Sequence, residues 1–78
     1  LKKYYHVLIR SMITVLVNEN QVEIEESANL NQLMQKVNSN INGVAIAINN
    51  QIISKDSWDK QTLNQNDKVL LIKATQGG

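Results

Sequence analysis

The spacing of the apolar residues changes in the middle of the chain, and this change restricts the possible folds more than any other feature of the sequence. One segment has the i, i+3, i+4, i+7 spacing of a helix face: Leu30, Leu33, Met34 and Val37. Before and after it, apolar residues alternate with polar ones or form short continuous runs, which indicates strands. A chain with one short helix between groups of strands is expected to form a two-layer α+β domain.

Two strands are expected ahead of this helix. Residues 13–17 alternate with β-branched residues on one face, and residues 22–25 alternate apolar with acidic side chains. The Asn-Glu-Asn sequence between them favours a turn, because Asn tolerates left-handed backbone angles. The two segments are therefore predicted to form a β-hairpin. Asn29 is a suitable N-cap for the helix that follows, and Gln32, three residues later, completes a capping box.

Further strands are expected after the helix. Residues 44–48 place large side chains on one face and alanine on the other, and residues 51–53 form a short return strand after an Asn-Asn turn. A single helical turn is expected at residues 54–58 and a further chain turn at residues 64–67. Residues 69–72 (Val-Leu-Leu-Ile) form a continuous apolar run, which is typical of a central strand buried on both faces. We therefore place this last strand beside the first and parallel to it, in a mixed sheet of four or five strands.

The basic charge is concentrated at the N-terminal end. Residues 1–11 contain three basic residues and no acidic residue, whereas the remaining residues carry a net charge of −2. This contrast predicts that residues 1–11 are a non-native or upstream leader and that residues 12–78 form one domain. A signal peptide is not expected, because the apolar run in this segment is too short. Residues 4–9 could instead add a strand at the edge of the sheet.

The composition excludes several kinds of site. The chain has no cysteine for a disulfide or a thiolate metal site, and one histidine cannot make a multi-histidine zinc site. A formal charge of +1 gives no reason to expect nucleic-acid binding, and no apolar run approaches the ~18 residues of a membrane helix. Asp56 and Asp59 lack a third ligand, and Trp58 is expected in the core or as a lid. We therefore expect a cytoplasmic protein without a bound metal.

The terminal Gly77-Gly78 follows closely on the predicted central strand and contributes nothing to packing. Glycine is costly to order and a terminus without anchors is mobile, so a frayed end without function is the simplest interpretation. The alternative is a thin, flexible tail over residues 75–78, which passes through a narrow channel and delivers its carboxylate to a partner enzyme. Because the tail follows a central strand in a β-β-α-β-β-β order, we favour the second interpretation.

Residues 12–78 carry a resemblance to a known family. Its features are the first strand with its Asn18 turn, the helix around Leu33, the segment 45–53 (Ala-Ile-Ala-Ile-Asn-Asn-Gln-Ile-Ile), Trp58, the turn and strand at residues 66–71, and the terminal diglycine. With these features the chain resembles the ThiS-type sulfur carrier proteins of thiamine biosynthesis, which belong to the ubiquitin-like β-grasp proteins. The resemblance implies an α+β fold in which a mixed four- to five-stranded sheet packs on one helix.

The resemblance also implies a function. The Gly78 carboxylate would be adenylated with ATP by a ThiF-type adenylyltransferase, and sulfur from a cysteine desulfurase or a rhodanese-type donor would convert it to a thiocarboxylate. Thiazole synthase would then take this sulfur. The carrier would be a protein co-substrate and not an enzyme, a monomer when free, with no cofactor of its own. Gly77 and Gln76 would thread into the partner, although Gln76 stands where a small or apolar residue is expected.

A docking surface for the adenylyltransferase is expected on the sheet beside the tail, around Ala45, Ala47 and Leu70. The small alanine side chains would let a partner approach closely, but they would equally let the helix do so. A second candidate surface consists of acidic residues in and after the second strand, which could face a basic partner or simply be solvated: Glu23, Glu25 and Glu26.

Three other functions remain open at this point. The small subunit of molybdopterin synthase shares the β-grasp fold and the thiocarboxylate chemistry, but it usually has a longer insert around the helix. A ubiquitin-like modifier would be conjugated to lysine side chains of target proteins. A simple interaction module would make no use of the terminal glycines.

Overall fold

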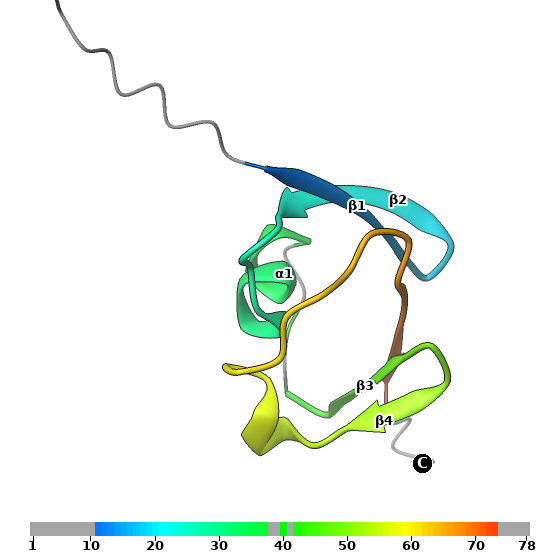
Figure 1. The fold of residues 1–78 in the computed structure, drawn as a ribbon. Coiled ribbons are helices and arrows are strands. Elements are labelled where there is room, and N and C mark those ends of the chain that lie inside the picture. The colour runs from blue at the N-terminus through cyan, green and yellow to red at the C-terminus, as the bar shows by residue number, and fades with distance from the viewer. Residues whose placement is uncertain (1–10, 38–39, 41, 74–78) are drawn as a thin grey trace, which may run out of the picture.

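The computed structural model describes residues 11–37, 40 and 42–73. In this part of the chain, five strands form one sheet and a single α-helix packs on one of its faces (Figure 1). The strands are β1 (Met12–Val17), β2 (Asn20–Glu25), β3 (Val44–Ile48), β4 (Gln51–Ile53) and β5 (Lys68–Lys73). The helix α1 covers Leu30–Lys36, and a 3₁₀ turn, η1, covers Lys55–Ser57. The expected α+β architecture is confirmed.

The strand order in the sheet is β2-β1-β5-β3-β4, so the last strand lies at its centre. β5 runs parallel to β1 and antiparallel to β3, and the antiparallel hairpins β1–β2 and β3–β4 form the two sides. The predicted position of this strand, central and parallel to the first, is confirmed. The two sides are staggered, because β5 pairs with β1 only at Lys68 and Val69 but with β3 from Val69 to Lys73.

Both hairpins close with two-residue turns that contain asparagine. Asn18 and Glu19 have φ angles of 47° and 72°, and Asn49 and Asn50 have φ angles of 50° and 72°. Positive φ at both central residues is the geometry of the type I′ turn, whose twist matches that of the strands it joins. Asparagine adopts these angles more readily than other residues with a side chain, so the chain makes two tight hairpins without glycine in either turn.

The N-terminus of α1 has the predicted capping box. The Asn29 side chain accepts a hydrogen bond from the Gln32 backbone N–H at 2.8 Å, and the Gln32 side chain accepts one from the Asn29 N–H at 2.8 Å. The Asn29 amide also donates to the carbonyl of Asp59 at 3.0 Å, which ties the helix start to the loop after η1. At the other end of the helix, the Lys36 ammonium donates to the carbonyl of Glu23 on β2.

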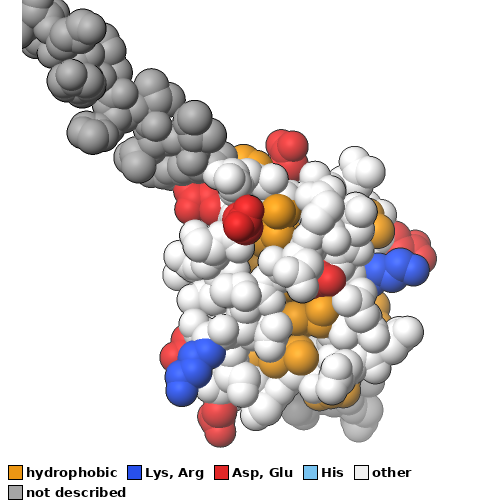
Figure 2. All heavy atoms as spheres, viewed as in Figure 1, with side chains coloured by type: hydrophobic (Ala, Val, Ile, Leu, Met, Phe, Trp, Pro, Cys, Tyr) orange, Lys and Arg blue, Asp and Glu red, His pale blue; other side chains and the backbone are white. Residues whose placement is uncertain are grey.

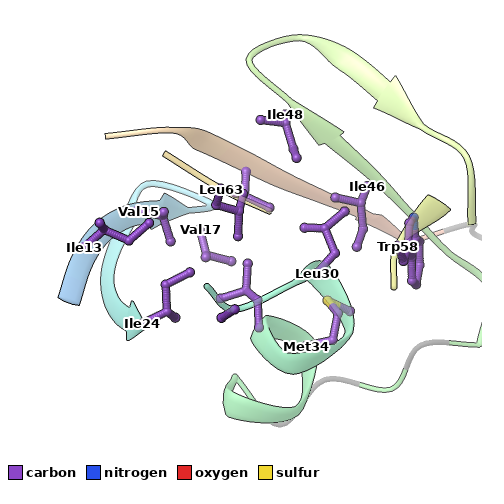
Figure 3. Packing of buried hydrophobic residues seen from close by; sticks show 13 residues of the cluster. Ile13, Val15, Val17, Ile24, Leu30, Met34, Ile46, Ile48, Trp58 and Leu63 are labelled. Carbon is purple, nitrogen blue, oxygen red and sulfur yellow. The ribbon is translucent and has the colours of Figure 1, made fainter. Parts of the chain in front are cut away.

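The hydrophobic core lies between α1 and one face of the sheet, as Figure 3 shows. Its buried members are Ile13, Val15, Val17, Ile24, Ala28, Leu30, Leu33, Met34, Ile46, Ile48, Trp58, Leu63 and Val69. Trp58 lies at one end of this core with 2% of its surface exposed, and its indole N–H donates to the Ile53 carbonyl at 3.1 Å. The indole therefore closes the core, and its polar atom is satisfied by the backbone after β4.

The prediction that residues 69–72 are buried on both faces of the sheet is wrong. Val69 is buried against the core, but 49% of Leu70 and 41% of Ile72 are exposed. The reason is that α1 covers one face of the sheet, and in the described part of the chain no second helix covers the other. Successive strand residues point to opposite faces, so every second residue of β5 is left on the uncovered side.

Some expectations fall on residues outside the described part of the chain. They are the leader up to residue 10, the possible edge strand at residues 4–9 and the flexible tail at residues 75–78, and they remain predictions. The carbonyl of Ser11 accepts a hydrogen bond from the Glu26 N–H at 2.8 Å, so the backbone bonding of the first hairpin extends one residue ahead of Met12.

Candidate functional site

β5 is the strand that leads to the terminal diglycine. Its last residue is Lys73, five positions before Gly78. An extended chain covers at most about 3.5 Å per residue, so five residues reach at most about 18 Å beyond Lys73. The predicted tail residues Gln76, Gly77 and Gly78 themselves lie outside the described residues. The structure describes β5 and the sheet around it, which precede this tail in the chain.

The beginning of β5 is held by a buried carboxylate. Asp67 is 9% exposed, and its two side-chain oxygens accept hydrogen bonds from the Asn49 amide at 2.9 Å and from the Asn64 N–H at 2.8 Å. The Asn49 side-chain oxygen in turn accepts from the Lys68 N–H at 2.9 Å. Because each polar atom named here has a partner, these bonds fix the start of β5 against the β3–β4 turn.

Asn18 holds the middle of β5 at the point where β1 ends. Its backbone N–H donates to the Val69 carbonyl at 2.9 Å, and its side-chain oxygen accepts from the Leu71 N–H at 2.9 Å. The Asn18 side chain thus provides the hydrogen-bond acceptor that the backbone of β1 would provide if this strand continued. The sequence predicts Asn18 only as a turn residue, and its bond to β5 spans 53 positions, so no local pattern indicates it.

The face of the sheet opposite α1 presents exposed apolar side chains. The register pairs Ala47 with Ile52 on one side and with Leu70 on the other, and Ala45 with Ile72. Directly opposite residues share a face of the sheet, so these five residues form one surface, which we call the open face. Ile52 is 61% exposed, and Leu70 and Ile72 are each more than two-fifths exposed.

The three predicted docking residues all lie on the open face, but they are not equally accessible. Ala45 and Leu70 are exposed, whereas Ala47 is only 4% exposed because the larger side chains of Ile52 and Leu70 flank it. Sequence reasoning missed Ile52 and Ile72. The first could have been found from the two-residue Asn-Asn turn, since that turn fixes a register in which Ile52 stands opposite Ala47.

A shallow hollow of about 340 Å³ adjoins the open face at Leu70. It lies between the two hairpin turns, and it is lined by Leu16, Asn18, Glu19, Asn50, Lys68, Val69 and Leu70. Its floor is mainly apolar and its rim carries one acidic and one basic side chain. A hollow of this kind can accept an apolar side chain from a partner protein.

The acidic residues of the second candidate surface do not form one patch with the open face. Glu23 and Glu26 are exposed and Glu25 is half-buried, and β1 lies between their strand and β5. Asp56 and Asp59 are exposed at η1 and in the turn after it. Among the described residues, no three metal-binding side chains lie close enough to hold an ion. His6 lies outside this part of the chain.

Charged side chains of the described residues do not gather on the face that Figure 2 shows. On the face shown in Figure 2, acidic and basic side chains are scattered, with hydrophobic patches between them and no continuous basic area. Within the described residues, no helix is long and apolar enough to cross a membrane.

Comparison with known proteins gives consistent matches. The model of the ThiS family matches residues 9–78. The sulfur carrier protein ThiS of Escherichia coli (strain K12) is 25% identical over 64 residues, which covers 82% of this chain and 97% of that protein. The crystal structure of the thiamine biosynthesis protein ThiS from Geobacter metallireducens has a TM-score of 0.73 at 20% identity, over 85% of this chain and 100% of that one. The structural match confirms the predicted β-grasp fold.

Proposed function

Because this chain belongs to the ThiS family, we propose that it is a sulfur carrier protein of thiamine biosynthesis that holds sulfur as a thiocarboxylate at Gly78. The observation that carries the proposal is the family match over residues 9–78, which includes β5 and the diglycine to which it leads. Such a carrier is a protein co-substrate and not an enzyme. The family match also favours the thiamine branch over the molybdopterin synthase branch.

The chemistry at Gly78 requires activation, because a carboxylate oxygen is a poor leaving group. In the proposed first step, the carboxylate attacks the α-phosphorus of ATP on a ThiF-type adenylyltransferase and pyrophosphate leaves. A persulfide from a cysteine desulfurase or rhodanese-type donor then attacks the acyl carbon, and AMP leaves. A thiol cleaves the resulting disulfide and releases the thiocarboxylate, from which thiazole synthase takes the sulfur. The partner supplies the charge stabilisation for these steps.

The carrier's own contribution is to present the tail from a rigid frame. Asp67 and Asn18 hold β5 at its start and its middle, so the position of Lys73 is fixed relative to the sheet. The last two residues before the carboxylate are glycines, which have no side chains and fit a narrow channel. A fixed strand followed by a thin tail lets a partner locate the carboxylate by binding the sheet.

The open face is the surface that we propose for this docking. The carboxylate stays within about 18 Å of Lys73, so an enzyme that holds it must also come close to the end of β5. Ile72 and Leu70 lie on β5 just before that end, and both are exposed. A contiguous patch of exposed apolar side chains is typical of a protein interaction site. Ala47 is covered by its neighbours, so we assign the contacts to Ile52, Leu70 and Ile72.

We further propose that this function is carried out in the cytoplasm, on a monomeric carrier. The adenylation step is tested by ATP–pyrophosphate exchange with a purified ThiF-type adenylyltransferase. Exchange that depends on the intact chain, and that is lost when Gly78 is deleted, would support the proposal. Exchange that is unaffected by the deletion would contradict it. Sulfur transfer to thiazole synthase, compared with transfer to a large molybdopterin synthase subunit, separates the two branches.

A further inference from the structure

Within the part of the chain that the structure describes, one edge of β5 is open beyond the end of β1. Val69 and Leu71 direct their backbone groups toward β1 and the Asn18 turn, as the bonds of Asn18 to the Val69 carbonyl and the Leu71 N–H show. Backbone groups alternate in direction along a strand, so the N–H of Lys73 also points to this side, while those of Leu70 and Ile72 point toward β3. Beyond Asn18, β5 therefore has a partner strand on its β3 side alone within the described residues.

The type I′ turn keeps β1 from continuing along this edge of β5. Asn18 and Glu19 both have positive φ, so the backbone turns back into β2 immediately after Asn18 has bonded to Leu71. In the described residues, the Leu71 carbonyl and the Lys73 N–H have no hydrogen-bond partner on this side, since the pairing with β1 ends at Val69 and Asn18 bonds only to the Val69 carbonyl and the Leu71 N–H. An exposed row of unpaired backbone groups is a template for another strand.

The position of this edge matters because it directly precedes the tail. Gly78 is five positions after Lys73, so an enzyme that holds its carboxylate has its surface within about 18 Å of the open edge. The side chains of Leu70 and Ile72 flank the edge on the open face, so a partner bound to that face would approach the same strand.

We propose that an extended segment of the adenylyltransferase pairs with β5 at the Leu71 carbonyl and the Lys73 N–H, and so adds a strand to the sheet. The inference rests on the proposed function. Main-chain pairing would hold the last described residues of β5 in an extended conformation, and it would direct the tail along the partner's surface. It would also recognise the carrier independently of the side chain at position 73.

The test compares Lys73→Pro with Lys73→Ala. Both substitutions remove the lysine side chain, but proline alone removes the N–H of the open edge. This N–H points away from β3, so the proline costs no hydrogen bond within the sheet, and proline is tolerated at such an edge. We expect Lys73→Pro to bind the adenylyltransferase about three- to tenfold more weakly than Lys73→Ala, since the loss of one backbone hydrogen bond has an effect of this order. Circular dichroism and urea unfolding of both variants monitor the fold.

A second measurement uses the unmodified chain. Hydrogen exchange is started in the complex with the adenylyltransferase and read residue by residue by mass spectrometry, and the Lys73 amide is expected to exchange more slowly than in the free protein. Equal affinities of the two variants, or an unchanged exchange rate at Lys73, would overturn the strand pairing. If both variants bind equally and, like the wild type, support normal pyrophosphate exchange, the strand pairing is wrong but the proposed function stands. If the wild type supports none, both proposals fail.

Discussion

The side chain of Asn18 accepts a hydrogen bond from the backbone N–H of Leu71 at 2.9 Å, although 53 positions separate the two residues in the sequence. This bond joins the turn of the first hairpin to the central strand and marks the point where β1 ends beside β5. A residue that closes a type I′ turn therefore also holds the strand that leads to the terminal diglycine.

Two substitutions at Asn18 separate its two roles. Asn18→Gly keeps the positive φ but removes the bond to Leu71, and we expect a loss of about 1 kcal/mol in the free energy of unfolding. Asn18→Ala removes the bond and adds backbone strain, so its loss should be larger by about 1 kcal/mol. Urea unfolding measures both values. A glycine variant as stable as the wild type would show that the bond contributes nothing.

The Asn49–Asp67 pair allows a test by exchange of the two residues. In Asp67→Asn, an NH₂ group replaces one of the two acceptor oxygens and must face a donor, either the Asn49 amide or the Asn64 N–H. We therefore expect the free energy of unfolding to fall by about 2 kcal/mol. In Asn49→Asp, two carboxylates meet, and the loss should be similar or larger. The double variant restores every bond, because the new amide donates to the new carboxylate and its oxygen accepts from the Asn64 N–H. Urea unfolding should therefore show the double variant more stable than either single one; additive losses would contradict the arrangement.

The capping box at α1 predicts a graded effect of changes at Asn29. Asn29→Asp keeps the acceptor for the Gln32 N–H but loses the donor to the Asp59 carbonyl, so we expect a loss below about 1 kcal/mol. Asn29→Ala loses both bonds and should cost about 1–2 kcal/mol. The measurement is again the free energy of unfolding in urea. Equal stability of the two variants would mean that the cap does not stabilise the helix.

The open face predicts a local effect of charge on partner binding. Leu70→Lys places a charge among Ile52 and Ile72, and we expect kcat/KM for adenylation to fall at least about tenfold, since burial of one leucine side chain contributes about 1.5–3 kcal/mol. Met12→Lys is the matched control, because Met12 is 48% exposed, close to the value for Leu70, but lies at the far end of β1. Both variants should remain folded. An equal loss in the control, or no loss in Leu70→Lys, would contradict docking at the open face.

The sequence predicts the fold well where local chemistry decides the structure. The helix stripe, the Asn29 cap and the asparagine turns depend on neighbouring residues, and the structure confirms each of them. The central position of β5 follows from its apolar run. Which of its side chains are buried and which are exposed does not follow from it. A run of four apolar residues has the same sequence pattern whether the second face of the sheet is covered by a helix or is left open for a partner protein.

The candidate site is predictable only in part for the same reason. Leu70 and Ala45 are placed correctly on the exposed side, but Ala47 is covered by Ile52 and Leu70, a consequence of cross-strand register. The bond between Asn18 and Leu71 depends on the stagger of β1 against β5. Stagger is set by the packing of the whole sheet, so no segment of the sequence encodes it alone.

The central claim is that sulfur is carried on the carboxylate of Gly78, and the intact mass of the chain tests it most directly. The chain is incubated with ATP, a ThiF-type adenylyltransferase, a persulfide donor and a thiol, and fragmentation then locates any change of mass. We predict that the mass rises by the difference between one sulfur and one oxygen atom and that the change lies at Gly78. An unchanged mass with enzymes that are active on another ThiS protein, or a change located on a side chain, would contradict the claim.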